Sequence, residues 1–403
     1  MKTPWDFDQI IDRSNTGSAK WEPSVLEQKF GKGRGGLLPL WVADMDFPCP
    51  DVIFDAMEQR LSHRIFGYSL NDSQHNDALI DWFSRRHGWQ IQSDSIVNTP
   101  GIVPAVHYLI QCFTKPGDGV LIQPPVYYPF AQAIITNGRH VVENPLTLND
   151  YRYDMDFKDL EEKTRDPRVK LAVLCSPHNP VGRVWRREEL ERFGTICRQN
   201  NVLVFADEIH CDLVMPGFKH TSYHSISPEL TRSSIAGIAA SKTFNLAGLA
   251  HSCLVIPNDT HRQEIAHFFN SLGLSSTGTA NLFGAIAARA AYEGAEPWLV
   301  DLTRYIYDNY LYLKERVEKE LPGVRVFDLE ATYLPWIDFN PLGLSSKKII
   351  EIIEEKAGLA LDHGNWFGGE GAGFERINIA CPRKLLSRAT GALISAFIPF
   401  CKK

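Results

Sequence analysis

The chain has 403 residues, of which 44% are hydrophobic, and it carries a formal net charge of −6. This composition is typical of a globular protein long enough for two or three domains. The negative charge gives no electrostatic basis for binding nucleic acid or an anionic membrane surface.

The sequence contains neither the pattern of a targeting segment nor that of a metal-binding motif. No run of eighteen apolar residues occurs, and the first residues, MKTPWDFDQIIDRS, lack the apolar core of a signal peptide. The eight cysteines are dispersed and form neither a C-x-x-C pair nor a cluster with histidine at metal-ligand spacing. The sequence therefore predicts a cytoplasmic protein with reduced cysteines, no membrane span and no metal.

The N-terminal part predicts an arm followed by helices. The first forty residues are rich in Gly, Pro and Asn and end in GKGRGG, which indicates an extended arm. PLWVADMDF then predicts a short strand and a turn. Apolar residues recur at helical spacing over 51–65 and 74–87. We expect residues 1–50 to form the arm and part of a small domain, with a large domain beginning at residue 51.

Between about residues 95 and 290, short apolar runs alternate with helical stretches such as 186–200. The runs are apolar on both faces and bounded by Pro, Asn, Asp or Gly; they are 119–123, 171–176, 202–207, 234–241 and 251–257. Such runs are typical of a mainly parallel sheet covered by helices on both faces. The predicted fold class is α/β, with a large domain at 51–290 whose ligands bind at the carboxyl ends of the strands.

After residue 290 the pattern changes. We expect a long amphipathic helix over 297–321, a helix at 345–357, the Gly-rich segment DHGNWFGGEGAGFERINIA, and a last helix near 384–402. This pattern predicts a smaller α+β domain spanning residues 291–403.

Four polar motifs lie at predicted element ends. SPHNPVG, DEIH and SK each follow an apolar run, and TPGIV opens a predicted helix. Singly, each motif has an ordinary structural explanation: an acid after a strand is often a helix N-cap, NPVG is turn chemistry, and a lysine after a strand is usually exposed. Their occurrence together is what indicates a ligand site.

The four motifs fit one ligand. A helix N-terminus with free N–H groups at Gly101 and Ile102 binds phosphate. Asp207 beneath a protonated pyridine nitrogen would make a heterocycle a stronger electron sink, and Asn179 could fix a phenolate oxygen. Lys242 could hold an aldehyde as a Schiff base and then carry a proton. These are the groups that pyridoxal 5′-phosphate (PLP) requires.

The order of the motifs resembles that of the fold-type-I PLP enzymes of the aspartate aminotransferase superfamily. Asp207 lies 28 residues after Asn179, and Lys242 lies 35 residues after Asp207. The segments LPLWVADMDFPCP, FGYS, PPVYYPF, DEIHCDLV, SKTFNLAGL and ERINIACPR more closely resemble the MalY/PatB-type cystathionine β-lyases, or cysteine-S-conjugate β-lyases. The resemblance is colinear from about residue 5 to residue 400. It implies an aspartate aminotransferase-like fold and a PLP cofactor.

The resemblance implies roles around the cofactor ring. Lys242 would hold PLP and remove the substrate Cα proton, Asp207 would pair with the pyridinium nitrogen, and Asn179 would donate to ring O3′. His210 would contact O3′ or the layer behind the ring, or would be a buried core histidine. Tyr127 would stack on the ring face.

The resemblance also implies how the phosphate is held. Contacts would come from the N–H groups of 101–103, including Val103, from Ser241, and from Tyr68 of the partner subunit. A shared tyrosine of this kind implies an obligate homodimer with shared active sites. Transaminases commonly place an arginine eight residues after the lysine, where this chain has Ala250, and this departure favours the lyase branch.

On the substrate side, Arg376 in ERINIA would hold the α-carboxylate in a bidentate fork. An arginine of a surface ion pair is the structural alternative. Ala43 and Asp44 in WVADMD, together with Asn179, would line the substrate pocket, and Trp366 would form part of its wall.

The implied reaction is α,β-elimination of a small-molecule sulfur amino acid. Cystathionine or another cysteine S-conjugate would give pyruvate, ammonia and a thiol. A PLP-dependent aminotransferase uses the same residues and stays open as an alternative. A regulatory binding protein that retains the PLP pocket and an α/β binding protein without PLP also stay open.

Overall fold

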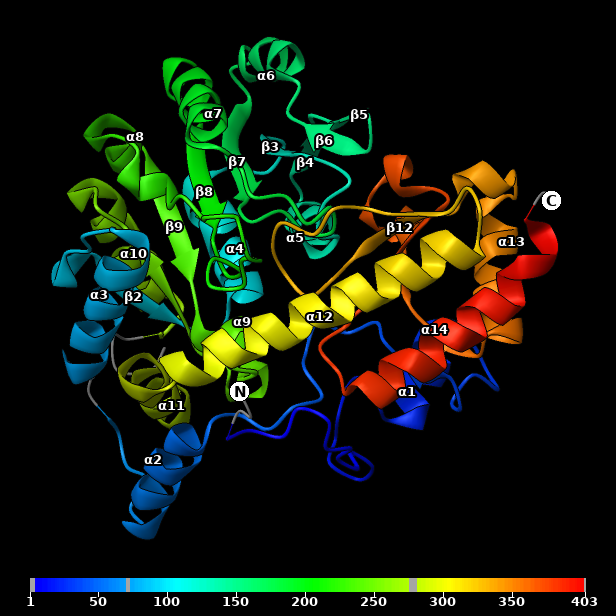
Figure 1. Cartoon of the computed structure of the whole chain (residues 1–403). Coiled ribbons are helices and arrows are strands. Elements are labelled where there is room, and N and C mark those ends of the chain that lie inside the picture. The colour runs from blue at the N-terminus through cyan, green and yellow to red at the C-terminus, as the bar shows by residue number, and fades with distance from the viewer. Residues whose placement is uncertain (1–3, 70–72, 275–280, 402–403) are drawn as a thin grey trace.

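A seven-stranded sheet forms the centre of the computed structural model, which describes residues 4–69, 73–274 and 281–401 (Figure 1). The strand order is β2-β10-β9-β8-β7-β3-β4. The strands are β2 (Ile96–Thr99), β3 (Gly119–Ile122), β4 (His140–Glu143), β7 (Val169–Cys175), β8 (Leu203–Asp207), β9 (Ser234–Ile238) and β10 (Ser252–Val255). Strands β9, β8, β7, β3 and β4 pair in parallel, whereas β10 is antiparallel to both of its neighbours. The predicted mainly parallel sheet is confirmed.

Helices cover both faces of this sheet, because successive strand residues point to opposite faces. Along β7, Leu171 and Val173 pack in the core that contains α4 (Ile102–Phe113), α5 (Pro129–Thr136) and α10 (Asp259–Ser271). Ala172 and Leu174 pack in the core that contains α6 (Phe157–Thr164), α7 (Arg187–Gln199) and α8 (Pro228–Arg232). Near β9 and β10 the covering helices are α3 (Ser73–His87) and α11 (Leu282–Gly294), and α2 (Asp51–Ser62) packs on α11.

A second, four-stranded antiparallel sheet has the order β11-β12-β15-β14. Its strands are β11 (Arg325–Val326), β12 (Trp336–Asp338), β14 (Asp362–His363) and β15 (Phe374–Arg376). The long helix α12 (Glu296–Glu320) extends from the region of α11 to this sheet, where α13 (Ser346–Glu351) and α14 (Arg383–Phe397) also lie (Figure 1). This is the smaller α+β part that the sequence predicts. The domain boundary at residue 291 stays a prediction.

The N-terminal segment differs from the predicted extended arm. It contains α1 (Pro23–Phe30), which begins at a proline and buries Leu26. Beyond it, β1 (Leu38–Pro39) pairs in parallel with β13 (Leu359–Ala360), so this segment is joined to the C-terminal part of the chain. A small hairpin is formed by β5 (Thr147–Asn149) and β6 (Arg152–Asp154).

Two predicted helices are shorter or less regular than expected. The helix at 345–357 is α13 followed by a π-helical turn at 352–356, and the last helix ends at Phe397, before a short 3₁₀ turn. Among the described residues, no helix combines the length and the apolar character needed to span a membrane.

Candidate active site

A cavity of about 240 Å³ lies at the carboxyl ends of β7 and β8, where parallel strands are expected to bind ligands. Most of the predicted site residues line it. They are Ala43, Gly101, Ile102, Val103, Tyr127, Asn179, Asp207, His210, Ser241 and Lys242. Segments that are far apart in the sequence therefore meet at one cavity.

Lys242 lies on the short helix α9 (Ala240–Thr243), directly after β9. Its Nζ donates a hydrogen bond of 2.8 Å to the carbonyl oxygen of Ala43. Burial, reinforced by the positive charge of Arg376, lowers the pKa of Lys242 to about 8. A substantial fraction of this amine is therefore neutral, and nucleophilic, near physiological pH.

The segment that carries Ala43 is held in place by side chains from distant elements. The Tyr333 hydroxyl donates to the Ala43 carbonyl at 2.9 Å. Asn245, three residues after Lys242, donates through Nδ2 to the carbonyl oxygens of Met45 and Phe47, each at 3.0 Å. These bonds tie the segment 43–47 to the lysine loop.

Asp207 ends β8, and its Oδ1 accepts a hydrogen bond of 3.1 Å from the Ile209 N–H. Burial raises the pKa of Asp207 to about 7, against the Ile209 hydrogen bond and the attraction of Lys242, which both lower it. A cation bound in the cavity would stabilise the ionised form of this carboxylate.

Arg376 ends β15 and lies behind the cavity wall. It is only 2% exposed, so the alternative of a surface ion pair is wrong. Its guanidinium donates to Asn179 Oδ1 and to the Trp41 carbonyl, each at 2.9 Å, and pairs with the buried carboxylate of Asp362. Among the described residues, the buried Arg376 Nε has no hydrogen-bond partner. Three of the five guanidinium N–H groups are thus engaged, and the Nε hydrogen and one Nη1 hydrogen have no partner among the described residues.

The first turn of α4 forms one end of the cavity. Gly101 precedes the helix with φ 148°, in the region that favours glycine, and the first helical hydrogen bond there runs from the Ala105 N–H to the Gly101 carbonyl. The N–H groups of residues 101–103 therefore have no helical acceptor, which makes this end suited to an anion. Ser241 and Ala250 also line the cavity.

His210 lines the cavity as a buried, neutral imidazole. Burial, with the positive charges of Lys242 and Arg376, lowers its pKa to about 3. Its Nδ1 is buried without a hydrogen-bond partner in the part of the chain that the structure describes. A buried polar atom without a partner next to a cavity favours a role in the site over a purely structural one.

Besides Arg376, three predicted residues lie outside the cavity lining. The Asp44 carboxylate pairs with Arg13 at 2.8 Å, and Trp366 lies beneath the Lys29 ammonium, whose Nζ is 3.6 Å from the indole centroid. Tyr68 is fully exposed. Asp44 thus pairs with the N-terminal arm and Trp366 packs against α1. Tyr68 does not line the cavity of its own chain.

Sequence reasoning missed several lining residues: Pro100, Pro104, Cys175, Ile209, Ala247 and His251. It also missed Asp362, which faces Arg376 directly in the β14–β15 pair. For His251, the polar first residue of the apolar run HSCLVIP was the available signal. Asp362 gave no signal, because its importance arises only from the strand pairing.

The fold and the site define a class: an α/β protein with a second, smaller sheet, whose cavity at the strand ends presents a lysine of lowered pKa near a buried aspartate. The chain belongs to the aminotransferase class I and II family, whose model matches residues 37–393. The predicted aminotransferase-like fold is thereby confirmed.

Individual relatives are similar over nearly the whole chain. Cystathionine beta-lyase PatB of Bacillus subtilis (strain 168) is 42% identical over 378 residues, which are 93% of this chain and 95% of the relative. The structure of cystalysin from Treponema denticola, which contains a pyridoxal 5′-phosphate cofactor, has 36% identity and a TM-score of 0.92, covering 98% of this chain and 99% of that one. The PLP-bound C-S lyase from Staphylococcus hominis has 32% identity and a TM-score of 0.89, with coverage of 98% and 99%.

Proposed function

We propose that the protein is a PLP-dependent carbon–sulfur lyase that cleaves cystathionine or other cysteine S-conjugates to pyruvate, ammonia and a thiol. The observation that carries this proposal is the cavity in which Lys242, Asp207 and Asn179 meet the first turn of α4. The similarity to PatB and to PLP-bound C-S lyases supports elimination over transamination.

The residues of the cavity fit PLP by the chemistry of their donors and acceptors. The open N–H groups before and within the first turn of α4 suit a phosphate, and the buried carboxylate of Asp207 suits a pyridinium cation. Asn179 Oδ1 is committed to Arg376, so its amide N–H₂ group is available to a phenolate oxygen. Bound PLP supplies an electron sink for negative charge at the substrate Cα.

Lys242 Nζ is the atom that holds the cofactor and moves the proton. With a pKa of about 8, it is basic enough to take a proton from Cα and acidic enough to return one. The Ala43 carbonyl holds this nitrogen in place. Because a carbonyl is a neutral acceptor, it does not stabilise the protonated amine as a carboxylate would.

Arg376 binds the substrate carboxylate. Asp362, Asn179 and Trp41 hold the guanidinium rigidly, and the Nε hydrogen and one Nη1 hydrogen are the donors left for the substrate. A carboxylate fixed there orients the amino acid, so that its Cα hydrogen is presented to Lys242.

The protein acts as a homodimer in which Tyr68 completes the site of the partner subunit. Tyr68 is fully exposed, and it is preceded in sequence by exposed apolar residues of α2 and the following segment: Val52, Phe54, Leu61, Ile65 and Phe66. An apolar surface of this kind is typical of a protein interface. In such a dimer, the hydroxyl of Tyr68 would donate to the PLP phosphate in the partner subunit's site.

A product assay tests the function. The purified protein, loaded with PLP, is incubated with cystathionine, cystine and an S-alkyl-cysteine, and thiol and pyruvate are measured side by side. Elimination gives pyruvate from each substrate without any added keto acid, with an equal amount of thiol from cystathionine and S-alkyl-cysteine and of cysteine persulfide from cystine. Turnover that depends strictly on a keto acid would instead identify an aminotransferase, and a Lys242→Ala variant serves as the inactive control.

A further inference from the structure

Strand pairing places His251 beside the first turn of α4, the end of the cavity that is suited to an anion. Strands β2 and β10 are antiparallel, with Ser252 opposite Thr99. One step further, the pairing brings His251 level with Pro100, directly before the open turn at Gly101. His251 also lines the cavity.

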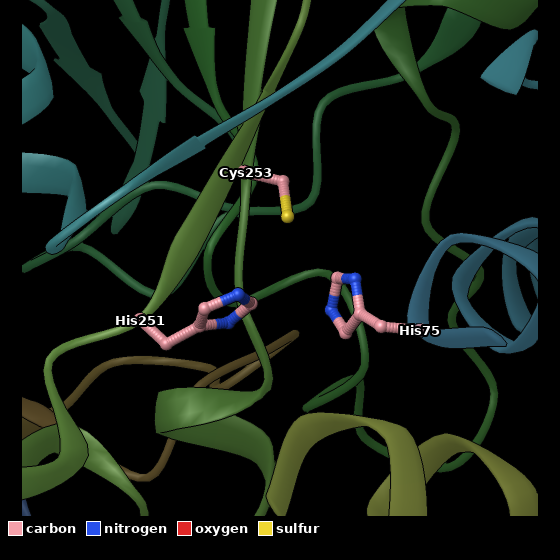
Figure 2. Close-up of side chains that lie close together, drawn as sticks. All are labelled: His75, His251 and Cys253. Carbon is pink, nitrogen blue, oxygen red and sulfur yellow. The ribbon is translucent and has the colours of Figure 1, made fainter. Parts of the chain in front are cut away.

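The imidazole of His251 is buried and incompletely bonded. The residue is 7% exposed, and among the described residues its Nε2 has no hydrogen-bond partner. The ring of His75, from α3, packs against it edge to face, with centroids 4.8 Å apart (Figure 2). Gly284 of α11 also packs closely against this residue, because a Cβ added at Gly284 would lie 2.7 Å from the His251 Cβ.

The adjacent Ala250 contributes no charge to the same end of the cavity. Ala250 has a left-handed backbone with φ 45° and presents only a methyl group to the cavity. Between residues 241 and 251 the cavity lining consists of Ser241, Lys242, Ala247, Ala250 and His251, of which Ser241, Lys242 and His251 have polar side chains.

A metal ion is the alternative ligand for this cluster, since His75, His251 and Cys253 point toward one another (Figure 2). Their ligand atoms all lie within 4.8 Å of one another. However, the buried Cys253 thiol donates to Asn98 Oδ1 at 3.3 Å, and burial raises its pKa to about 12, whereas a metal binds the thiolate. The engaged, protonated thiol favours a ligand in the cavity over a metal between the three side chains.

We propose that His251 is a phosphate-binding residue of the cofactor site, donating to the PLP phosphate where the chain has no basic side chain at position 250. This inference rests on the proposed function, because it concerns the cofactor of that function. Burial and the neighbouring His75 lower the pKa of His251 to about 3, so it would act as a neutral N–H donor unless the phosphate dianion draws a proton onto it.

Comparing PLP with pyridoxal tests the proposal, since pyridoxal has the same ring and aldehyde but no phosphate. Both ligands are titrated into cofactor-depleted wild-type protein and into His251→Leu, and binding is followed by absorbance. A lost hydrogen bond to a charged group predicts that His251→Leu weakens PLP binding about 10- to 100-fold while pyridoxal binding changes less than about twofold. His251→Asn, which retains a donor, should recover part of the loss. The ³¹P NMR signal of bound PLP should shift in His251→Leu holoenzyme.

The controls separate this inference from the function itself. His224→Leu removes another buried histidine, one outside the cavity lining, and should leave both affinities unchanged. Equal weakening of PLP and pyridoxal binding in His251→Leu would overturn the phosphate assignment while leaving the proposed function intact. Failure of wild-type protein to bind either ligand would overturn both. One equivalent of zinc in wild-type protein that is lost in His251→Leu would replace the phosphate assignment by a metal site.

Discussion

Lys242 Nζ donates to the carbonyl oxygen of Ala43, 2.8 Å away and 199 residues earlier in the chain. No carboxylate lies within ion-pairing distance of this amine in residues 4–69, 73–274 and 281–401, so burial and the positive charge of Arg376 outweigh the attraction of Asp44 and Asp207 and lower its pKa. The lysine is positioned by a neutral group and therefore keeps the lowered pKa that a nucleophile and proton carrier needs.

Covalent uptake of PLP should depend on pH through Lys242. Only the neutral amine attacks an aldehyde, so the uptake rate of cofactor-depleted protein should rise about tenfold per pH unit below a pKa of about 8 and level off above it. Stopped-flow absorbance between pH 6 and pH 9 measures this. Lys242→Arg keeps a charge but should show no covalent uptake. A rate that is independent of pH would contradict the lowered pKa.

Asp207→Asn should lower turnover by roughly 100-fold, because the ring nitrogen would lose the charge that stabilises its protonated form. Asp207→Glu should retain more activity than Asp207→Asn, since it keeps the carboxylate. Thiol release under saturating PLP measures both variants. Similar turnover in Asp207→Asn and wild-type protein would exclude this role.

Asp207→Asn should also make the cofactor-depleted protein more stable, relative to wild-type protein, at high pH than at low pH. The folded pKa of Asp207, about 7, lies above the ordinary value of 3.8, so the folded state binds the proton more tightly than the unfolded state does. Its contribution to stability is complete below about pH 4 and is lost as the pH rises to about 7. Asparagine does not titrate, so the Asp207→Asn variant does not lose stability in this way. The Tm of the variant minus the Tm of wild-type protein should therefore be larger at pH 8 than at pH 5. Thermal unfolding at the two pH values is the measurement.

Arg376→Lys should lower kcat/KM by roughly 30- to 100-fold, the equivalent of a charged hydrogen-bond pair. A lysine keeps the charge beside Asp362 but cannot keep the contacts to Asn179 and Trp41 while donating to a carboxylate. PLP affinity should change little, which separates substrate binding from damage to the site. Arg376→Ala is a poorer test, because it would leave the Asp362 carboxylate buried without its partner.

Complementation between subunits should reveal a shared site. Tyr68→Ala and Lys242→Ala homodimers should each have low activity at limiting PLP. In a mixed dimer, one site carries both changes and the other carries neither, so co-expression of the two chains should recover about a quarter of wild-type activity. Purification through two different affinity tags isolates the mixed dimer. Failure to recover activity in that dimer would show that Tyr68 does not act across subunits.

Much of the fold was predictable from local patterns. The five apolar runs form five strands of the central sheet. They are too short for buried helices and are bounded by turn residues, so a strand was the expected structure. The antiparallel direction of β10 was not predictable, since a run that is apolar on both faces carries no information on strand direction. The helix α1 was missed because Gly and Pro dominate the composition around it.

By itself, the sequence determined which residues end strands and begin helices, and thus that Asn179, Asp207, Lys242 and the turn at Gly101 meet at one edge of a sheet. Parallel strands bring their carboxyl ends together, so order along the chain is sufficient for that conclusion. Only the tertiary structure decided that Asp362 and Asn179 hold Arg376, that Ala43 holds Lys242, and that His251 adjoins the open turn. These relationships depend on strand register and burial, which join segments far apart in the chain and set the charge of each buried group.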